Sequence, residues 1–380
     1  MTELVNGFQN QDIKQAVVCG LGPGDGHEFK TEIPVYPVYF ETEQLPFRVT
    51  GMSDEMPYPS TRYCDLTDIQ VVEFRTVFLK EIRKAIEEFC PDIILCHHLY
   101  LLTAFVREAF PTHKVFGVCH GSDLRQIRKN KLEREFIKKQ IANLDGIFAL
   151  HDVQKKEIEE IYCYNENRVT VIGVGYNERI FYQTNRRAMK PPMQIIFAGK
   201  ISEKKGVFSL LRSMEYLQYE KQEVILKLAG GSGAENEFQE IRHLAAKNKY
   251  PVEFLGKLTQ KELAEEFNRC HLFVLPSFYE GLPLVTVEAM ACGLNVVVTD
   301  LPGIQEWLAK RVEGNTVVYV KPPQMKDADV PVEEELEDFE KRLGKAITEA
   351  LEKQQAPSYD LMQISWNGVC EKILRVIEKS

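Results

Sequence analysis

The chain lacks several features that would assign it quickly to a structural class. Its nine cysteines are an odd number with no C-x-x-C pair, which argues against a disulfide framework and a structural zinc site. No apolar run reaches the ~20 residues that a membrane-spanning helix needs. Acidic residues outnumber basic ones, and the net charge of −9 gives no support to nucleic-acid binding. The N-terminus shows no charged-then-apolar leader, so we expect a cytoplasmic protein.

What the chain has is enough apolar sequence for more than one domain. Hydrophobic residues make up 44% of its 380 residues, which indicates a globular core and not disorder. Single cores stop growing near about 250–300 residues, so we expect two domains. Short apolar runs alternate with amphipathic helices, which is typical of parallel sheets with crossover helices. The sequence therefore predicts an α/β protein.

The expected strands form two sets, one in each half of the chain. In the first half they are Gln15–Cys19, Asp92–Cys96, Lys114–Cys119, Gly146–Leu150 and Val169–Ile172. In the second half they are Gln194–Ala198, Val224–Ala229, Val252–Leu255, Leu272–Leu275, Asn295–Thr299 and Val317–Val320. A polar, proline-bearing stretch at residues 182–193 lies between the sets, and we expect a linker there. The last helix, Trp366–Lys379, follows a break at Pro357.

The segment PSFYEGLPLVTVEAMACG, Pro276–Gly293, is the most informative part of the chain. It follows a short apolar strand and places Glu280 and Glu288 eight residues apart around a helix start. Two glutamates at this spacing also occur by chance on charged helices. The buried strand before them and the small residues Ala289 and Ala291 after them favour a functional interpretation.

The start of this helix indicates an anion site. Pro283 suits the first helical position, and Leu282 before it offers no capping oxygen. The amides of Leu284 and Val285 therefore lack an obvious protein partner, and a phosphate is a natural substitute. Glu288 lies ~6 Å further along the axis, about the reach from a diphosphate to a ribose hydroxyl.

At this segment the chain resembles the retaining family 4 glycosyltransferases of the GT-B fold. Their signature is a Glu-x7-Glu loop and helix written much like EGLPLVTVEAMACG, and the resemblance extends over most of the chain. It implies two Rossmann-like domains that face each other across a cleft. Residues 1–181 with 365–380 would form the acceptor-side domain, residues 182–193 the linker, and residues 194–364 the nucleotide-sugar-binding domain. The last helix would cross back onto the N-terminal domain.

The chain departs from this family at its start. It opens with an expected helix, Thr2–Asn10, that runs into a strand, whereas the family begins with a central strand and a Gly-rich loop. Two interpretations stay open: the sequence lacks its true beginning, or this member is built differently. The GLGPGDG segment, Gly20–Gly26, is no replacement, because no apolar helix opens directly after it. We expect a turn-rich loop there.

A basic turn in FAGKISEKKGVFSLL is a second part of the resemblance. The family pattern is G-R-x-x-x-E-K-G; Gly199, Lys205 and Gly206 match, Lys200 replaces the arginine and Lys204 the glutamate. The resemblance implies that Lys200 and Lys205 hold the diphosphate. Ligands of open α/β sheets bind at the carboxyl ends of strands, which favours this role over that of ordinary surface lysines. Lysine lacks the bidentate fork of arginine, so the contact at Lys200 would be looser.

Two further strand ends complete the expected donor site. Gly230 and Gly231 permit close backbone approach, so base and ribose edges are expected against them and against Lys257. Ordinary turn glycines are the alternative. The full substrate-binding set is Lys200, Gly230, Gly231, Lys257, Gly281, Leu282, Leu284, Val285 and Glu288.

Histidines follow two strands of the first half. The family has a histidine that contacts the donor sugar from the N-terminal domain, and the resemblance implies this role for His120. A lone histidine after a strand is more often a structural residue. Asp123, His97 and His98 are candidates for the acceptor side, with capping or turn contacts as an equal alternative for the two histidines.

Two charged stretches can be explained as solvent-exposed surface without a binding function. A helix is expected over Leu124–Leu144, with seven Lys or Arg against two Glu between Leu124 and Gln140. A solvated amphipathic face explains it; docking to an anionic membrane surface or a phosphorylated acceptor is the alternative. The acidic stretch Pro322–Glu340 is expected to be a solvated insertion.

These observations predict a metal-independent glycosyltransferase without a cofactor. It would move a hexose from a nucleotide-diphosphate sugar, with a UDP-sugar favoured, to an unknown acceptor hydroxyl with retention. The expected catalytic residues are His120, Lys205 and Glu280, and no D-x-D stands at a strand end. Two alternatives stay open, namely a nucleotide-sugar epimerase of the same fold and a non-catalytic nucleotide-sugar-binding protein.

Overall fold

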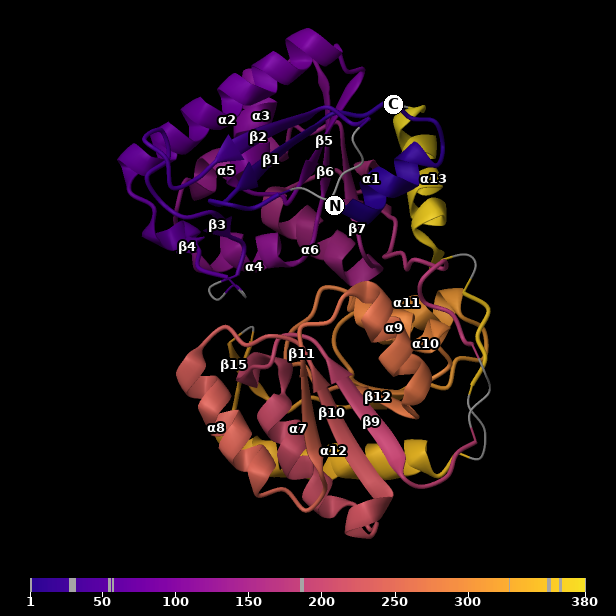
Figure 1. The fold of residues 1–380 in the computed structure, drawn as a ribbon. Helices are drawn as coiled ribbons and strands as arrows, with labels where there is room; N and C mark the ends of the chain where they lie inside the picture. Colours follow the sequence, from indigo (N-terminus) through magenta and orange to yellow (C-terminus); the bar gives the residue numbers. More distant parts are fainter. Residues whose placement is uncertain are drawn as a thin grey trace. The chain divides into compact units, whose positions relative to one another are not determined.

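The computed structural model describes residues 2–26, 32–53, 56, 58–184, 188–327, 329–353, 357–361 and 364–379. The chain forms two compact units, labelled by element in Figure 1. Unit 1 comprises Met1–Gly173 and Trp366–Ser380, and unit 2 comprises Val174–Ser365. Unit 2 is therefore inserted, along the chain, between two parts of unit 1.

The division between the units falls before the expected linker. The backbone N–H of Tyr176 already bonds to Ile364 O of unit 2 at 3.2 Å, and Phe181 packs on Phe267 of the same unit. The Asn268 side chain, also in unit 2, donates to Tyr182 O at 2.9 Å. These contacts attach the start of the 182–193 stretch to unit 2; its residues 185–187 lie outside the described residues.

Unit 2 is built on one six-stranded parallel sheet of order β11-β10-β9-β12-β13-β14. Its strands are β9 (Met193–Ala198), β10 (Val224–Ala229), β11 (Val252–Gly256), β12 (Leu272–Leu275), β13 (Asn295–Thr299) and β14 (Val318–Val320). Its helices are α7 (Val207–Ser213), α8 (Glu235–Ala246), α9 (Gln260–Arg269), α10 (Leu284–Ala291), α11 (Ile304–Arg311) and α12 (Leu336–Leu351). All six strands expected from the apolar runs are confirmed, with ends that differ by at most one residue.

Among its described residues, unit 1 contains two main parallel sheets and one very short parallel pair of strands. One pairs β1 (Val17–Leu21) with β2 (Val35–Tyr39), and the other has the order β5-β6-β7-β8. The four strands of the second sheet are β5 (Ile93–His97), β6 (Lys114–Val118), β7 (Gly146–Ala149) and β8 (Val169–Val171). The helices are α1 (Thr2–Gln9), α2 (Asp68–Phe89), α3 (Leu101–Ala109), α4 (Ser122–Lys129), α5 (Arg134–Ile141), α6 (Asp152–Tyr162) and α13 (Trp366–Ile377). Two short strands, β3 (Thr50–Gly51) and β4 (Thr61–Arg62), pair with each other.

The first and last helices of the chain pack together within unit 1 (Figure 1). A Cβ atom at Gly7 would lie 2.5 Å from Cys370 Sγ, so a larger residue there would have to displace the thiol between α1 and α13. The thiol of Cys370 in turn lies 3.5 Å from Leu4 O. Both helices cover the same face of the four-stranded sheet, where Phe116 and Phe148 are buried.

The helix expected over Leu124–Leu144 is in fact two helices, α4 and α5. The helical conformation is interrupted before α5, where Glu133 has a left-handed backbone with φ +46°. The Arg134 side chain crosses the break and donates to Asn130 O at 2.9 Å, which satisfies a carbonyl at the end of α4. Arg125 is buried and donates to Ser53 Oγ. The prediction of one helix over Leu124–Leu144 is therefore wrong, and contact of this stretch with an anionic membrane stays an untested prediction.

Two details of the first sheet also differ from expectation. Gly20 and Leu21 belong to β1, so the loop expected at Gly20–Gly26 begins only after Leu21. Strand β2 was not predicted because Pro37 interrupts its apolar pattern. Proline is tolerated there because β2 is an edge strand that pairs only with β1 among the described residues. In the part of the chain that the structure describes, no helix combines the length and apolarity that crossing a bilayer requires.

Candidate functional site

Two loops of unit 2 meet at the carboxyl edge of its sheet. The first follows β9 and contains a short 3-10 turn, Glu203–Lys205, before α7 begins; the second joins β12 to α10. The backbone N–H of Phe278 in the second loop donates to Lys204 O in the first at 3.1 Å. Gly206 has φ +70°, and a Cβ atom there would lie 2.0 Å from Pro276 O. The two loops therefore touch through their backbones.

This contact brings Lys205 against Glu280. The Lys205 ammonium lies 2.6 Å from Glu280 Oε1, and Ser277 Oγ donates to the same oxygen at 2.7 Å. The Lys205 side chain is 28% exposed and that of Glu280 is 16% exposed. A partly buried carboxylate thus orients a cation that is still accessible to an anionic ligand.

The start of α10 differs by one residue from the prediction. Pro283 is the N-cap residue itself, with φ −73° and ψ 101°, and Leu284 is the first helical residue. No side chain caps this helix, as the missing Ser, Thr, Asp or Asn indicated. Glu288 lies in the second turn and is only 7% exposed. Buried carboxylates are uncommon, and this one lies on the helix whose start faces the Glu280 loop.

The remaining predicted residues of unit 2 follow neighbouring strands. A Cβ atom at Gly230 would lie 1.8 Å from Gly199 O, so the ends of β10 and β9 are in contact. At Gly231 a Cβ atom would lie 2.5 Å from Lys257 Cε, so the Lys257 side chain covers that backbone. Lys200 directly follows Gly199. The strands β11, β10, β9 and β12 are adjacent and parallel. These residues and Glu280 therefore all lie at the carboxyl ends of the strands, on the same side of the sheet.

Sequence reasoning missed an ion pair beside this site. Lys204, which replaces the glutamate of the family pattern, lies 3.1 Å from Asp329 Oδ2. Asp329 is 2% exposed and connects β15 (Met325–Asp327) to β16 (Val330–Pro331), so the acidic stretch Pro322–Glu340 is not simply solvated. The sequence did contain a signal for this ion pair. Lys204 stands where the family pattern has a glutamate, and a lysine there calls for an acidic partner elsewhere in the chain.

Glu340, at the end of the same stretch, is also buried. Its carboxylate accepts from Ser209 Oγ at 3.2 Å and lies 3.4 Å from the Arg212 guanidinium. Burial raises the pKa of Glu340 in spite of these partners. The acidic stretch therefore contributes two carboxylates, Asp329 and Glu340, to the packing of unit 2.

Three histidines gather in unit 1 at the carboxyl ends of β5 and β6. His97 Nδ1 lies 2.9 Å from His120 Nε2, so one ring donates a hydrogen bond and the other accepts it. The ring centroids of His98 and His120 are 4.5 Å apart. His98 adopts a left-handed backbone with φ +69°, which turns its ring toward His120.

Asp123 organises the loops that carry these histidines. It is completely buried and accepts hydrogen bonds from the backbone N–H groups of Leu99 at 2.8 Å, His120 at 3.2 Å and Leu124 at 3.1 Å. The first donor follows β5 and the other two follow β6, so one carboxylate holds both strand ends. Asp123 is therefore placed to position His97 and His120 and not to touch a ligand itself.

The histidines are kept neutral by their surroundings. Burial lowers the pKa of His97 well below its usual range, and the neighbouring His120 lowers it further. Burial likewise lowers the pKa of His98, and it lowers that of His120 to about 3. The His97–His120 hydrogen bond requires a neutral acceptor ring, so these shifts preserve it over the neutral pH range.

We expect the free energy of unfolding to fall as the pH is lowered from about 6.5 to 5. The unfolded histidines take up protons near pH 6.5, whereas the folded ones stay neutral until a much lower pH. Each contributes up to about 1.4 kcal/mol per pH unit in this window. Urea unfolding at pH 7.5, 6.5, 5.8 and 5.0 measures the slope. The slope of unfolding free energy against pH should become shallower in His97→Phe. It should stay unchanged in His243→Gln, an exposed position on α8. Equal slopes in wild type and both variants would contradict the expectation.

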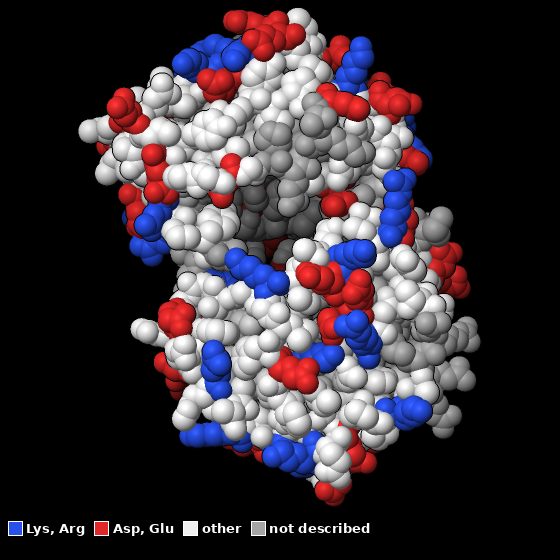
Figure 2. Space-filling view, viewed as in Figure 1, with Lys and Arg blue, Asp and Glu red and all other residues white. Residues whose placement is uncertain are grey.

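The described residues form neither a surface of one charge on the face shown nor a cluster of metal ligands. On the face shown in Figure 2, acidic and basic side chains are interspersed. Within the described ranges, no group of three or more His, Cys, Asp or Glu side chains is placed to hold a metal ion. Of the Asp327–Asp329 pair, Asp329 is bound to Lys204, and residue 328 between them lies outside the described residues.

Comparison with known proteins decides the family. Residues 1–179 match the profile described as Glycosyltransferase Family 4, and residues 179–350 match that of Glycosyl transferases group 1. The chain belongs to the family 4 glycosyltransferases. Alpha-maltose-1-phosphate synthase of Mycobacterium tuberculosis is 29% identical over 259 residues, which are 62% of this chain and 63% of that protein. This chain spans about half the length of the curated relatives it matches.

Solved structures show that this family 4 chain has the GT-B fold. Sucrose-phosphate synthase from Thermosynechococcus elongatus superimposes with a TM-score of 0.67 at 16% identity, covering 99% of this chain and 91% of that one. HepE from Anabaena, in complex with UDP and glucose, gives a TM-score of 0.66 at 13% identity and covers 100% of this chain and 95% of its own. The resemblance stated from the Glu-x7-Glu segment is thus confirmed for the fold and the family.

Proposed function

We propose that this protein is a retaining glycosyltransferase that moves a hexose from a nucleotide-diphosphate sugar to an acceptor hydroxyl. The observation that carries the proposal is the Lys205–Glu280 pair at 2.6 Å, next to the uncapped start of α10. A cation and free helix amides at one sheet edge are suited to a diphosphate. Unit 2 would bind the donor and unit 1 the acceptor.

The proposed donor site assigns each group a distinct contact. The diphosphate lies between the ammonium groups of Lys200 and Lys205 and the amides of Leu284 and Val285. Glu288 accepts hydrogen bonds from the ribose hydroxyls, and Glu280 orients hydroxyls of the sugar. Gly230, Gly231 and Lys257 border the base and ribose, while Gly281 and Leu282 line the loop beside the diphosphate.

The proposed reaction breaks the bond between the anomeric carbon and the diphosphate oxygen. The acceptor hydroxyl attacks from the same face, its oxygen bonds to the anomeric carbon, and its proton passes to the departing diphosphate. Lys205, Lys200 and the α10 amides stabilise the charge that grows on this leaving group. His120 holds the sugar, and His97 fixes the tautomer of His120. We propose that no metal is needed, because ammonium and amide groups supply the countercharge.

A UDP-sugar is the favoured donor. HepE, which shares the fold over the whole of this chain, was solved in complex with UDP and glucose. Titration calorimetry with UDP, GDP and ADP separates the candidate bases. Mass spectrometry of products from a panel of UDP- and GDP-sugars with cell extract then identifies the donor sugar and the acceptor. Release of free nucleotide only when acceptor is present supports transfer over epimerisation.

Glu288→Ala is expected to weaken UDP binding by about 10–100-fold, because each hydrogen bond to a charged group contributes about 1.5–3 kcal/mol. Titration calorimetry of wild type and variant with UDP measures the change. The matched control is Glu265→Ala, an exposed glutamate on α9, which should bind UDP like wild type. If wild type binds UDP and Glu288→Ala binds it equally well, the ribose assignment is wrong. If wild type binds none of the three nucleotides, the proposed function itself is wrong.

A further inference from the structure

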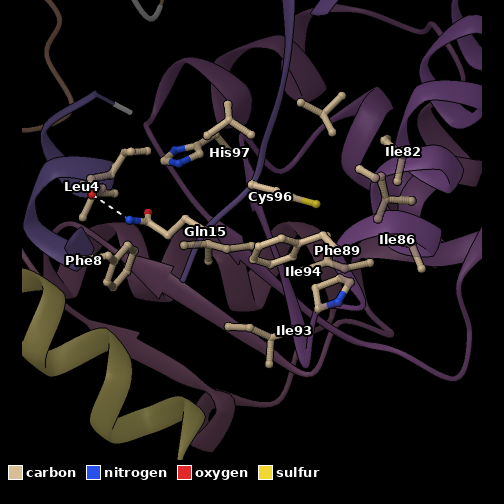
Figure 3. Close-up of a pocket in the computed structure, with 18 of the residues that line it drawn as sticks. Leu4, Phe8, Gln15, Ile82, Ile86, Phe89, Ile93, Ile94, Cys96 and His97 are labelled. Carbon is tan, nitrogen blue, oxygen red and sulfur yellow. Dashed lines mark hydrogen bonds between the residues drawn. The ribbon is translucent and has the colours of Figure 1, made fainter. Parts of the chain in front are cut away.

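Unit 1 contains a cavity of about 330 Å³ between the β1–β2 sheet and the four-stranded sheet (Figure 3). Strand β1 with the residues before it lines one side, and β5 lines another. Helices α1 and α13 contribute Leu4, Phe8 and Leu374, while α2 and α3 contribute Ile82, Ile86 and Val106. The cavity is thus bordered by two strands and by helices from both faces of the sheet.

The cavity lies against the edge of β5 and not against one of its faces. Side chains of a strand alternate between the two faces. Ile93 and Leu95 accordingly pack with α1 and α13, whereas Ile94 and Cys96 pack with the core under α2 and α3. A cavity on one face would touch only every second residue, yet all of Ile93–His97 line this one. The consecutive residues before and within the start of β1, from Lys14 to Val18, line it in the same way.

Backbone hydrogen-bonding groups point into this cavity from both strands. Among the described residues, β1 pairs only with β2 and β5 only with β6. Residues of a parallel strand bond alternately to the neighbour on either side. Since His98 N bonds to Val118 O of β6, the backbone groups of Leu95 and His97 face away from β6. Since Val17 N bonds on the β2 side, those of Val18 face away from β2.

The burial of these strands is lower than their composition indicates. The sequences VVCGL of β1 and IILCH of β5 are the continuous apolar runs of strands that are covered on both faces. Every residue of β5 is nevertheless only partly buried, whereas all four of β7 are fully buried. An apolar strand edge with unpaired backbone groups is a template for a further strand.

We infer that this cavity is a binding slot for one extended, apolar peptide strand that adds between β1 and β5. Such a strand would pair its backbone with both edges and present apolar side chains to the helices on either face, as in β-strand addition. About five residues suffice, since β5 itself has five. An acyl chain would fill the apolar space but leave the backbone groups of Leu95 and Val18 without partners. Binding would also fix β5, whose last residue, His97, holds His120.

The test is hydrogen exchange of the protein with and without the soluble peptide acetyl-Lys-Lys-Val-Ile-Val-Leu-Val-Lys-Lys-amide. We expect saturable one-to-one binding and at least tenfold slower exchange of the amides of Val18, Leu95 and His97. The matched control is the same peptide N-methylated at alternate valines, which keeps the side chains but loses amide donors. It should give no such protection.

Three outcomes would overturn this inference. Equal protection by the N-methylated peptide would show that backbone pairing is not involved. Protection by dodecanoate but not by the peptide would make the cavity a fatty-acyl site, and protection that depends only on protein concentration would make it an interface between copies. Ile94→Trp, which fills the cavity, should abolish peptide binding; its circular dichroism and its UDP titration establish whether it still folds. These readouts do not depend on sugar transfer, so they stand apart from the proposed function.

Discussion

Replacing Lys205 with alanine is expected to slow sugar transfer by about 10²–10³-fold, the usual loss when one charge-stabilising group is removed. The Lys205 ammonium is held 2.6 Å from Glu280 and is oriented before any donor arrives. Its charge is most valuable when negative charge grows on the departing diphosphate. The loss should therefore fall mainly on kcat, and the affinity for UDP should change less. The rate of UDP release with the donor and acceptor found by the product panel measures both.

Two further variants separate charge from structure at Lys205. Lys205→Arg retains the positive charge and should recover part of the rate. Lys261→Ala removes an exposed lysine on α9 and should change nothing. The double variant Lys205→Ala with Glu280→Gln tests whether the loss comes from leaving the Glu280 carboxylate without its cation. Full turnover in Lys205→Ala would remove the diphosphate role of this residue.

Gly206→Ala is expected to abolish measurable UDP binding and to destabilise unit 2 by about 3 kcal/mol or more. A left-handed backbone costs a non-glycine residue about 1–2 kcal/mol. In addition, the new Cβ atom would lie 2.0 Å from Pro276 O, so the Lys205 loop and the Glu280 loop would have to separate. Thermal unfolding and UDP titration measure the two effects.

Gly256→Ala is the matched control for this substitution. Gly256 also has φ +70°, but nothing lies within 4 Å of the position of a Cβ atom there. It should therefore show the backbone cost of about 1–2 kcal/mol and retain UDP binding. If Gly206→Ala and Gly256→Ala show the same stability and the same UDP binding, the contact between the two loops is not needed for the site.

The positions of the strands were predictable because the sheets are parallel and covered on both faces. Such strands are continuous apolar runs, and all those expected in unit 2 are present. Strand β2 was missed because it is an edge strand that tolerates Pro37. The break between α4 and α5 was missed because no glycine or proline marks it. Glu133 takes a left-handed backbone there, and the Arg134 side chain satisfies Asn130 O across the break, a contact that periodicity does not encode.

The site was predictable only as far as strand ends define it. Residues after neighbouring parallel strands must share one sheet edge, which placed Lys200, Gly230 and Glu280 together before the structure was known. Side-chain pairing was not predictable in the same way. Lys204 and Asp329 are 125 positions apart, and no local pattern links them. The hydrogen bond between His97 and His120 likewise joins residues that are 23 positions apart and follow different strands.

The packing of α1 on α13 has a practical consequence for cutting and rejoining this polypeptide. Because α13 belongs to unit 1, a shortened protein that stops at Ser365 would lose the helix that packs over Phe116 and Phe148. It would therefore expose apolar side chains to solvent. Expressing unit 1 alone therefore requires a circular permutant in which α13 is spliced ahead of α1 through a short glycine-serine tether. Unit 2 runs without interruption from Val174 to Ser365, so it can be excised directly and used to test the proposed donor binding.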